Sequence, residues 1–296
     1  MSDLPQVADV SRRNETYWER ASASRIDDYL LGGCNAYDRD RKVAESLCQV
    51  APWLPVMKRS AQRHGSQAVS TLAQSLGITQ FLDLGCGYAP GWGAGDVHDP
   101  PLPYESARAI HPGAKVVYVD ADWVVITHAH STLDQCAATT VVQAEVREVE
   151  PLLAGPVTQA LDERAPVGFL LHDLLPWLTD EEATQLLTAL RAWAPPGSAI
   201  SLTHASFNVA PGGSMEELVA TYAANDILFR PRSREQIAHL LGPWHIRDPG
   251  IALIEQRLGP RSPTPCPNVV RLRGDQAEEQ VVTVPAYAAI ATALSS

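Results

Sequence analysis

Five short apolar runs recur through the middle of the chain. They lie at residues 81–84, 115–120, 140–145, 167–173 and 199–204, and turn-forming or charged residues bound each of them. Runs of this length between turn residues are typical of buried strands in a parallel sheet. Two further strands are expected at about 244–254 and at 268–272, which gives a sheet of seven strands.

Amphipathic segments separate these runs. The residues after Thr179 place Ala183, Leu186, Leu190 and Trp193 on one helical face. Capping boxes, which mark helix starts, are predicted at Thr179-x-x-Glu182, Ser214-x-x-Glu217 and Ser233-x-x-Gln236. Strands that alternate with helices predict an α/β fold whose sheet is mostly parallel, with right-handed crossovers.

About eighty residues of mostly helical character precede the first strand. Helices are expected before the Gly32-Gly33 pair, over 38–48 and over 57–76, where Gly77 is the predicted C-cap. These helices either cap a site or pad the sheet. We therefore divide the chain into an N-terminal arm and helical cap (1–76), an α/β domain (77–274) and a C-terminal extension (275–296).

The run at 81–84 ends at Gly85-Cys86-Gly87, and the run at 115–120 ends on Asp120. Glycines let the backbone approach a ligand closely, and this turn lies where nucleotides bind an open α/β sheet. A carboxylate at the next strand end can accept hydrogen bonds from both ribose hydroxyls of an adenosine. The alternatives are an ordinary tight turn and, for Asp120, a helix N-cap.

Two details of this motif argue against a dinucleotide-binding enzyme. Pro90 stands where the third glycine of that fingerprint belongs, and Asp120 lies well beyond the roughly 20 residues that separate glycines and acid there. The pattern Asp83-x-Gly85-x-Gly87 with an acid-ended second strand better suits S-adenosylmethionine, which has an adenosine but no pyrophosphate.

Composition narrows the class of protein further. Of the 296 residues, 45% are hydrophobic, and 34 acidic against 23 basic residues give a formal charge of −11. That charge disfavours partners such as nucleic acid and anionic membranes. The first five residues resemble no secretion signal, and no apolar run reaches the ~20 residues that span a membrane. Five scattered cysteines without metal-type spacing indicate reduced thiols, no metal site and a cytoplasmic location.

Several motifs together resemble actinobacterial, Streptomyces-type S-adenosylmethionine-dependent methyltransferases. The family's Arg-x-x-Asp-Tyr-x-Leu-Gly-Gly signature corresponds to residues 25–33, its Gln-Phe-Leu-Asp-Leu-Gly-x-Gly to 80–87, and its Val-Val-Tyr-Val-Asp to 116–120. Its Gln-Ala-Asp-x-Arg corresponds to 143–147, where Glu145 replaces the aspartate. The similarity covers about residues 20–260 and implies a Rossmann-like class I methyltransferase fold with an N-terminal helical cap.

The resemblance also implies roles in binding S-adenosyl-L-methionine. Gly85 and Gly87 would admit the methionine part, Asp83 would orient this loop or the cofactor amine, and Asp120 would bind the ribose. Ala121 and Asp122 would flank the adenine, and Glu145 with Val146 would meet its edge. Arg25, Tyr29 and Gly33 would close the site from the cap.

For the acceptor side, the sequence offers only candidates. His172 and Asp173 leave the fourth predicted strand at the ligand-binding edge, and His98 follows a Pro-rich loop. Each could act as a base or be a hydrogen-bonded structural residue, and for His204 we favour the structural role. The acceptor is expected to be a small molecule of specialised metabolism, methylated on O, N or C.

Two departures from the family pattern keep other functions open. Ala36 stands where the family has an asparagine, and Leu175-Pro176 where it has Leu-His. One alternative is a protein that binds S-adenosylmethionine without reacting, or that uses it for another reaction. A second, weaker alternative is an NAD-dependent reductase. The oligomeric state is left open.

Overall fold

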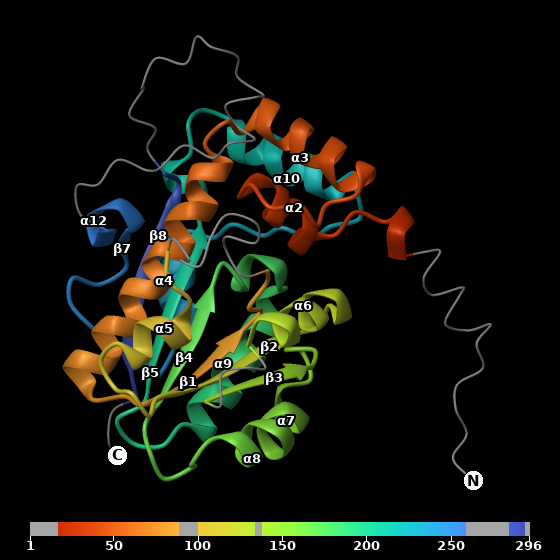
Figure 1. Ribbon diagram of the computed structural model, residues 1–296. Helices are drawn as coiled ribbons and strands as arrows, with labels where there is room; N and C mark the ends of the chain where they lie inside the picture. Colours follow the sequence, from red (N-terminus) through yellow and green to blue (C-terminus); the bar gives the residue numbers. More distant parts are fainter. Residues whose placement is uncertain (1–16, 89–99, 134–137, 259–283, 294–296) are drawn as a thin grey trace, which may run out of the picture.

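A computed structural model describes residues 17–88, 100–133, 138–258 and 284–293. Its centre is a sheet in which five strands run parallel in the order β3-β2-β1-β4-β5 (Figure 1). Their bounds are β1 Gln80–Leu84, β2 Lys115–Asp120, β3 Thr139–Gln143, β4 Val167–His172 and β5 Ala199–Ala205. Because β1 lies between β2 and β4, the strand order reverses there, and the carboxyl ends of these strands form the edge where ligands bind such sheets.

Three further strands, joined to the sheet by antiparallel pairing, complete it. β8 (Ala286–Thr292) pairs with β5 along its whole length and also with β6 (His245–Ile246) and β7 (Ala252–Leu253). Within the described part of the chain, the sheet therefore has eight strands rather than the predicted seven. The predicted strand at 268–272 lies outside the described residues, and β8 falls within the predicted C-terminal extension.

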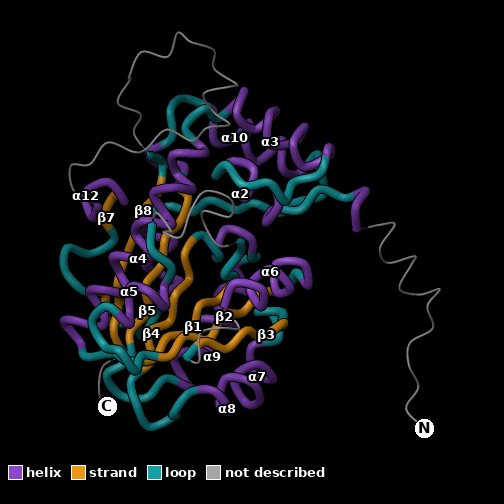
Figure 2. The backbone as a smooth tube through the Cα atoms, viewed as in Figure 1, coloured by secondary structure: helices purple, strands orange, loops and turns teal. Residues whose placement is uncertain are grey.

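Alternate residues of the central strands point to opposite faces, as the period of a strand requires. Phe81 and Val116 pack against α4 (Leu54–Leu76), α5 (Pro103–Arg108) and α6 (Trp123–Leu133). Leu82 and Val117 pack against α7 (Val149–Leu152), α9 (Asp180–Trp193) and α11 (Arg234–Leu241). The result is a sheet covered by helices on both faces (Figure 2), which confirms the predicted α/β class.

The remaining helices gather beyond the carboxyl end of the sheet. α2 (Ala23–Leu30), α3 (Asp38–Val50) and α10 (Ser214–Ala223) lie together there (Figure 1), and their buried faces share one apolar cluster with the first half of α4 and with α12 (Ile254–Leu258). Short pieces fill the connections: Leu153–Val157, α8 (Thr158–Ala160), Leu175–Trp177 and Phe207–Val209. That α2 and α3 act as a cap remains a prediction.

Helix ends test the capping predictions. Gly77 has φ 65° and caps α4, and the boxes at Thr179 and Ser233 are both formed. The box predicted at Ser214 is wrong, because Gly213 is the N-cap and Ser214 instead donates to the carbonyl of Pro211. α4 begins three residues earlier than predicted, since Pro55 lies in its first turn, where no backbone N–H partner is lost.

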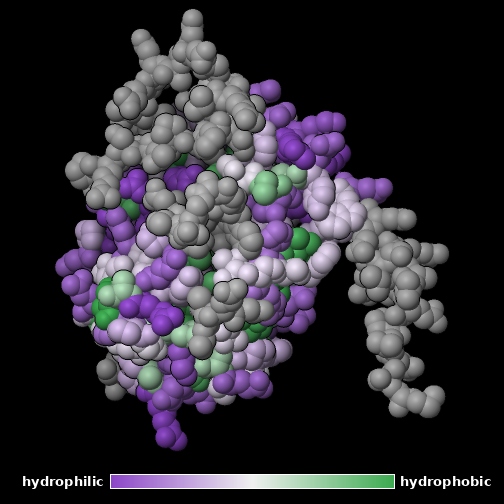
Figure 3. Space-filling view, viewed as in Figure 1, coloured by the Kyte–Doolittle hydropathy of each residue, from purple (hydrophilic) through white to green (hydrophobic). Residues whose placement is uncertain are grey.

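The visible described surface is mainly hydrophilic, and its hydrophobic atoms form small, separate patches (Figure 3). Within the described ranges, no helix combines the length and apolar character needed to cross a bilayer.

Candidate active site

A cavity of about 450 Å³ lies at the carboxyl edge of the sheet, beneath α2 and beside α4. Most of the site residues predicted from the sequence line it. These are Gly33, Asp83, Gly85, Gly87, Asp120, Ala121, Asp122, Glu145, Val146, His172 and Asp173. His98 lies outside the described residues, so its proposed role stays a prediction.

The glycine loop after β1 is held against the end of β2. The backbone N–H of Gly85 donates to the carbonyl of Val119 over 2.8 Å, and that of Gly87 donates to Oδ2 of Asp120 over 3.0 Å. Gly85 and Gly87 have φ of 69° and 61°, a conformation that favours glycine. A Cβ on Gly85 would also lie 2.7 Å from Cδ1 of Leu174, so this turn admits only glycine without rearrangement.

Two buried carboxylates face the loop from neighbouring strands. Burial, and secondarily the charge of Asp120, raises the pKa of Asp83 to about 7. Burial also raises the pKa of Asp120, although its backbone hydrogen bonds from Asp122 and Gly87 oppose the shift. A positively charged ligand at this point would relieve the repulsion between the two side chains, and S-adenosylmethionine carries such charge on its sulfur and amino group.

The end of the cavity that contains Asp120 and Asp122 is joined to the N-terminal segment. The hydroxyl of Tyr17 donates to both oxygens of Asp122 at 2.7 and 2.9 Å. Burial and this hydrogen bond raise the pKa of Tyr17, so the phenol keeps its proton. The rings of Tyr17, Trp18 and Trp123 are in mutual contact. Segments over 100 residues apart in sequence therefore meet at this edge.

Gly33 allows a close contact within the N-terminal signature. A Cβ there would lie 2.1 Å from Oδ1 of Asp28, whose carboxylate accepts hydrogen bonds from the backbone and side chain of Asn35. The signature glycine thus lets the chain fold around Asp28, which itself lines the cavity.

Arg25 and Tyr29, in contrast, are not among the lining residues. Arg25 is buried, and its Nε donates to Oδ2 of Asp40 at 2.7 Å while Nη2 donates to the carbonyl of Arg20 at 2.6 Å. Asp40 also accepts from the backbone N–H groups of Ser22 and Tyr37. This geometry ties α2 to α3. A direct contact between Arg25 and a cofactor carboxylate stays a prediction.

Glu145 and Val146 lie beyond the end of β3, at the cavity wall. Glu145 accepts a hydrogen bond from Arg147, which also donates to Glu182 at 2.8 Å and to the carbonyl of Trp177 at 2.9 Å. Arg147 thereby fixes the position of this wall relative to α9.

His172 is a weak base in this structure. Its Nε2 lies 3.0 Å from Oγ of Ser201, and burial lowers its pKa to about 4, so the ring is neutral at pH 7. Its ring centroid lies 5.7 Å from that of His64, another buried and neutral imidazole. His204 lies outside the cavity wall, between the carbonyl of Ala205 and Nη1 of Arg232, in keeping with a structural role.

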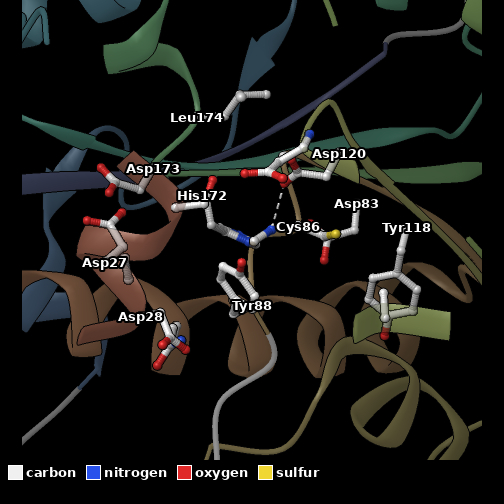
Figure 4. A pocket seen from close by; sticks show the side chains of 18 of the residues that line it. Asp27, Asp28, Asp83, Cys86, Tyr88, Tyr118, Asp120, His172, Asp173 and Leu174 are labelled. Carbon is white, nitrogen blue, oxygen red and sulfur yellow. Dashed lines mark hydrogen bonds between the residues drawn. The ribbon is translucent and has the colours of Figure 1, made fainter. Parts of the chain in front are cut away.

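A buried ion cluster that no sequence motif indicates lies at the other end of the cavity. Nζ of Lys58 on α4 donates to Oδ2 of Asp27 at 2.7 Å and to Oδ2 of Asp173. Burial favours loss of the lysine proton, but the two carboxylates outweigh it and raise the pKa of Lys58. The ammonium also lies 4.7 Å from the ring centroid of Trp177. Asp27 and Asp173 lie side by side, on the opposite side of the pocket from Asp83 (Figure 4).

Sequence reasoning also missed other lining residues. Asp27 and Asp28 lie inside the signature, and Tyr88 directly follows Gly87, so their neighbourhood gave a usable signal. No local pattern marks Lys58, because its partners Asp27 and Asp173 lie 31 and 115 positions away in the sequence. The described residues contain no group of three or more metal-ligating side chains.

Comparison with known proteins agrees with this geometry. A family model described as S-adenosyl methyltransferase matches residues 10–292. A crystal structure of a Thermobifida fusca YX protein assigned to the methyltransferases is 26% identical, with a TM-score of 0.76 over 93% of this chain and 96% of that one. A DUF574 family protein from Streptomyces avermitilis MA-4680 is also 26% identical, with a TM-score of 0.77 over 93% and 98%.

A more distant solved structure shares the fold alone. It is an S-adenosylmethionine-dependent methyltransferase from Anabaena variabilis ATCC 29413, 11% identical, with a TM-score of 0.50 over 79% of this chain and 86% of that one. No curated protein sequence matches significantly. Since the family model spans nearly the whole sequence, this chain belongs to the S-adenosyl methyltransferase family and is an S-adenosylmethionine-dependent methyltransferase.

Proposed function

We propose that this methyltransferase acts on a small molecule of specialised metabolism and that the cavity at the sheet edge holds both substrates. The observation that carries the proposal is one continuous cavity lined by Asp120 and the glycine loop at one end and by Asp27, Lys58 and Asp173 at the other. Its volume of about 450 Å³ is in the range of small-molecule sites. The resemblance to Streptomyces-type enzymes supports the metabolic role.

The residues fit the cofactor at the Asp120 end. Two buried acidic side chains suit its positive charge, and the buried hydroxyl of Tyr88 has no hydrogen-bond partner among the described residues. We assign Asp120 to the ribose, Asp122, Ala121, Glu145 and Val146 to the adenine, and Gly85 and Gly87 to the methionine part. When bound, S-adenosylmethionine supplies a methyl group on a positively charged sulfur, open to in-line displacement.

The chain then has to position the acceptor and exclude water. Holding the nucleophile about 3–3.5 Å from the methyl carbon can supply much of the rate, and a base adds roughly 10²–10⁴-fold when the acceptor carries a proton. His172 and Asp173 remain candidates for contact with the acceptor, since both line the cavity where β4 ends. Scattered cysteines support a cytoplasmic location.

Calorimetry with S-adenosylmethionine and with NAD tests the cofactor assignment. We expect heat from the first ligand and none from the second; binding of NAD alone would overturn the assignment. Transfer of a labelled methyl group from S-adenosylmethionine is then compared across a panel of small phenols, amines and carboxylic acids, a bulk protein extract and total RNA. Label in the small molecules is expected, and label confined to protein or RNA would refute a small-molecule acceptor.

A further inference from the structure

Among the described residues, one carboxylate oxygen of Asp27 finds no hydrogen-bond partner. Oδ2 accepts from Lys58 at 2.7 Å, whereas Oδ1 is buried and unpaired within the part of the chain that the structure describes. Asp27 lines the cavity. A buried carboxylate oxygen without a donor is costly, which indicates that a ligand donates a hydrogen bond to it.

The position of Asp27 indicates which ligand. Asp27 and Asp173 converge on one ammonium where β4 ends, while Asp120, the ribose candidate, closes β2 (Figure 4). β1 separates β2 from β4 in the sheet. If adenosine occupies the Asp120 side, the methyl group points toward the β4 side, and Asp27 is then close to the acceptor rather than to the nucleoside.

We propose that Asp27 is the catalytic base, and that the acceptor is methylated on an oxygen or nitrogen atom that carries a proton. Asp27 Oδ1 accepts the hydrogen bond of this O–H or N–H group and takes its proton as the new bond from oxygen or nitrogen to the methyl carbon forms. The carbon–sulfur bond breaks with its electron pair going to sulfur, which leaves S-adenosylhomocysteine. This inference rests on the proposed function.

The groups around Asp27 make it a better catalytic base than the other candidate residues. Burial raises the pKa of Asp27 to about 6, Lys58 opposes the shift and Asp173 adds to it. A base works best when its pKa is near the working pH. His172 is a poorer base, with a pKa of about 4. The charged and titratable groups around Asp27 are Lys58 on α4, Asp173 after β4, Asp28 on α2 and Tyr222 on α10.

Lys58 is a positioning residue in this scheme. Its ammonium holds Oδ2 of Asp27, so only Oδ1 remains for the acceptor. The backbone of Asp173 is held by β5, because its N–H donates to Oγ1 of Thr203 at 2.9 Å. Asp173 and Lys58 thereby orient the carboxylate of Asp27 without needing to contact the acceptor.

A binding experiment tests the site without turnover. The full-length protein, saturated with S-adenosylhomocysteine, is titrated by calorimetry with phenol against anisole, and with methylammonium against tetramethylammonium. We expect phenol or methylammonium to bind at least tenfold more tightly than its proton-free counterpart, and Asp27→Asn to abolish the difference. Phenol selectivity would indicate a hydroxyl acceptor, and methylammonium selectivity an amine. No selectivity in the wild type, or the same selectivity in the variant, would overturn the proposal.

Controls separate the proposal from simpler roles of Asp27. Asp38→Asn changes a carboxylate with a side chain 93% exposed and should match the wild type. Asp27→Asn should bind S-adenosylhomocysteine with unchanged affinity; a loss of tenfold or more would assign Asp27 to the cofactor and refute its role as base. If the wild type binds neither S-adenosylmethionine nor S-adenosylhomocysteine, the proposed function itself fails.

A pH profile provides the kinetic test. With the selected probe as acceptor, and with the rate divided by the free-amine fraction if that probe is methylammonium, S-adenosylhomocysteine formation should slow below about pH 6 in the wild type, as the base becomes protonated. Asp27→Asn should be about 10²-fold slower and lack this fall, and Asp27→Glu should restore it. An unchanged acidic limb in Asp27→Asn would assign the base to another residue.

Discussion

Gly87 donates its backbone N–H to the carboxylate of Asp120 over 3.0 Å, and this bond joins the loop after β1 to the end of β2. The other oxygen of Asp120 accepts the N–H of Asp122 over 2.9 Å. One carboxylate therefore orders both segments that we assign to the cofactor. It thereby fixes their spacing.

We predict that Asp120→Ala weakens binding of S-adenosylmethionine and leaves the fold intact. Hydrogen bonds to a charged group contribute on the order of 1.5–3 kcal/mol, so Kd should rise roughly 10- to 100-fold. Calorimetry measures the affinity, and circular dichroism checks the fold. Asp38→Ala is the matched control on an exposed site. Equal affinity in Asp120→Ala and wild type would move the ribose site elsewhere.

Two glycine substitutions in the same loop should differ in cost. Gly85→Ala and Gly87→Ala both place a side chain at positive φ, which costs about 1–2 kcal/mol. At position 85 the new Cβ meets Cδ1 of Leu174 at 2.7 Å, whereas at position 87 no atom of the described residues lies within 4 Å. Gly85→Ala should therefore unfold at a lower temperature than Gly87→Ala. The reverse order in thermal denaturation would contradict this packing.

Removing Lys58 should destabilise the protein in a pH-dependent way. Lys58→Met leaves Asp27 and Asp173 together without their cation, and breaking a buried pair costs about 3–5 kcal/mol. The folded-state pKa of Asp27, which burial raises and Lys58 lowers, should then rise further above its unfolded value. A raised pKa favours folding at low pH and disfavours it as pH increases. The loss of stability should thus be larger at pH 7.5 than at pH 5.

Urea denaturation at both pH values measures this difference. Lys42→Met is the control, because Lys42 is exposed on α3. An equal loss at the two pH values would show that the carboxylates do not respond to the missing ammonium.

The N-terminal helices are predicted to close over the cofactor. Residues 20–50 contain the Gly32-Gly33 break between α2 and α3, and the adjacent Tyr17 donates to Asp122 at the cavity wall. Closing segments sequester a reaction and complete a site. S-adenosylmethionine should therefore slow amide hydrogen exchange over 20–50, with little change in α11 on the far face. If amide hydrogen exchange is identical with and without cofactor, these helices only pack against the rest of the fold and do not close over the site.

The fold was predictable where local patterns were strong. β2 has the predicted bounds, and β1, β3, β4 and β5 differ from prediction by at most two residues at an end, because apolar runs between turn residues specify buried strands. β8 was missed because its sequence, AYAAIAT, consists mainly of alanine, which has little strand preference. Its pairing with β5 decides its conformation, and pairing cannot be read from the segment itself.

The candidate site likewise has one end that could be predicted from the sequence and one end that could not. The end that we assign to the cofactor follows from motifs within single segments, such as Asp83-x-Gly85-x-Gly87. The other end depends on Lys58, a residue of α4 that meets Asp27 and Asp173 only in the folded chain. Neither its spacing nor its neighbours distinguish it from an exposed helical lysine, so only the three-dimensional structure identifies it.

The place of β8 between β5 and β6 has a consequence for synthesis of the chain. β6 and β7 leave the ribosome before β8, yet each of them pairs with β8. Until residues 286–292 emerge, one edge of β5 has no strand to bond with, and such edges attract other chains. A nascent chain that stalled before residue 286 would carry the residues that we assign to the cofactor beside an unpaired strand edge that can bond with other chains.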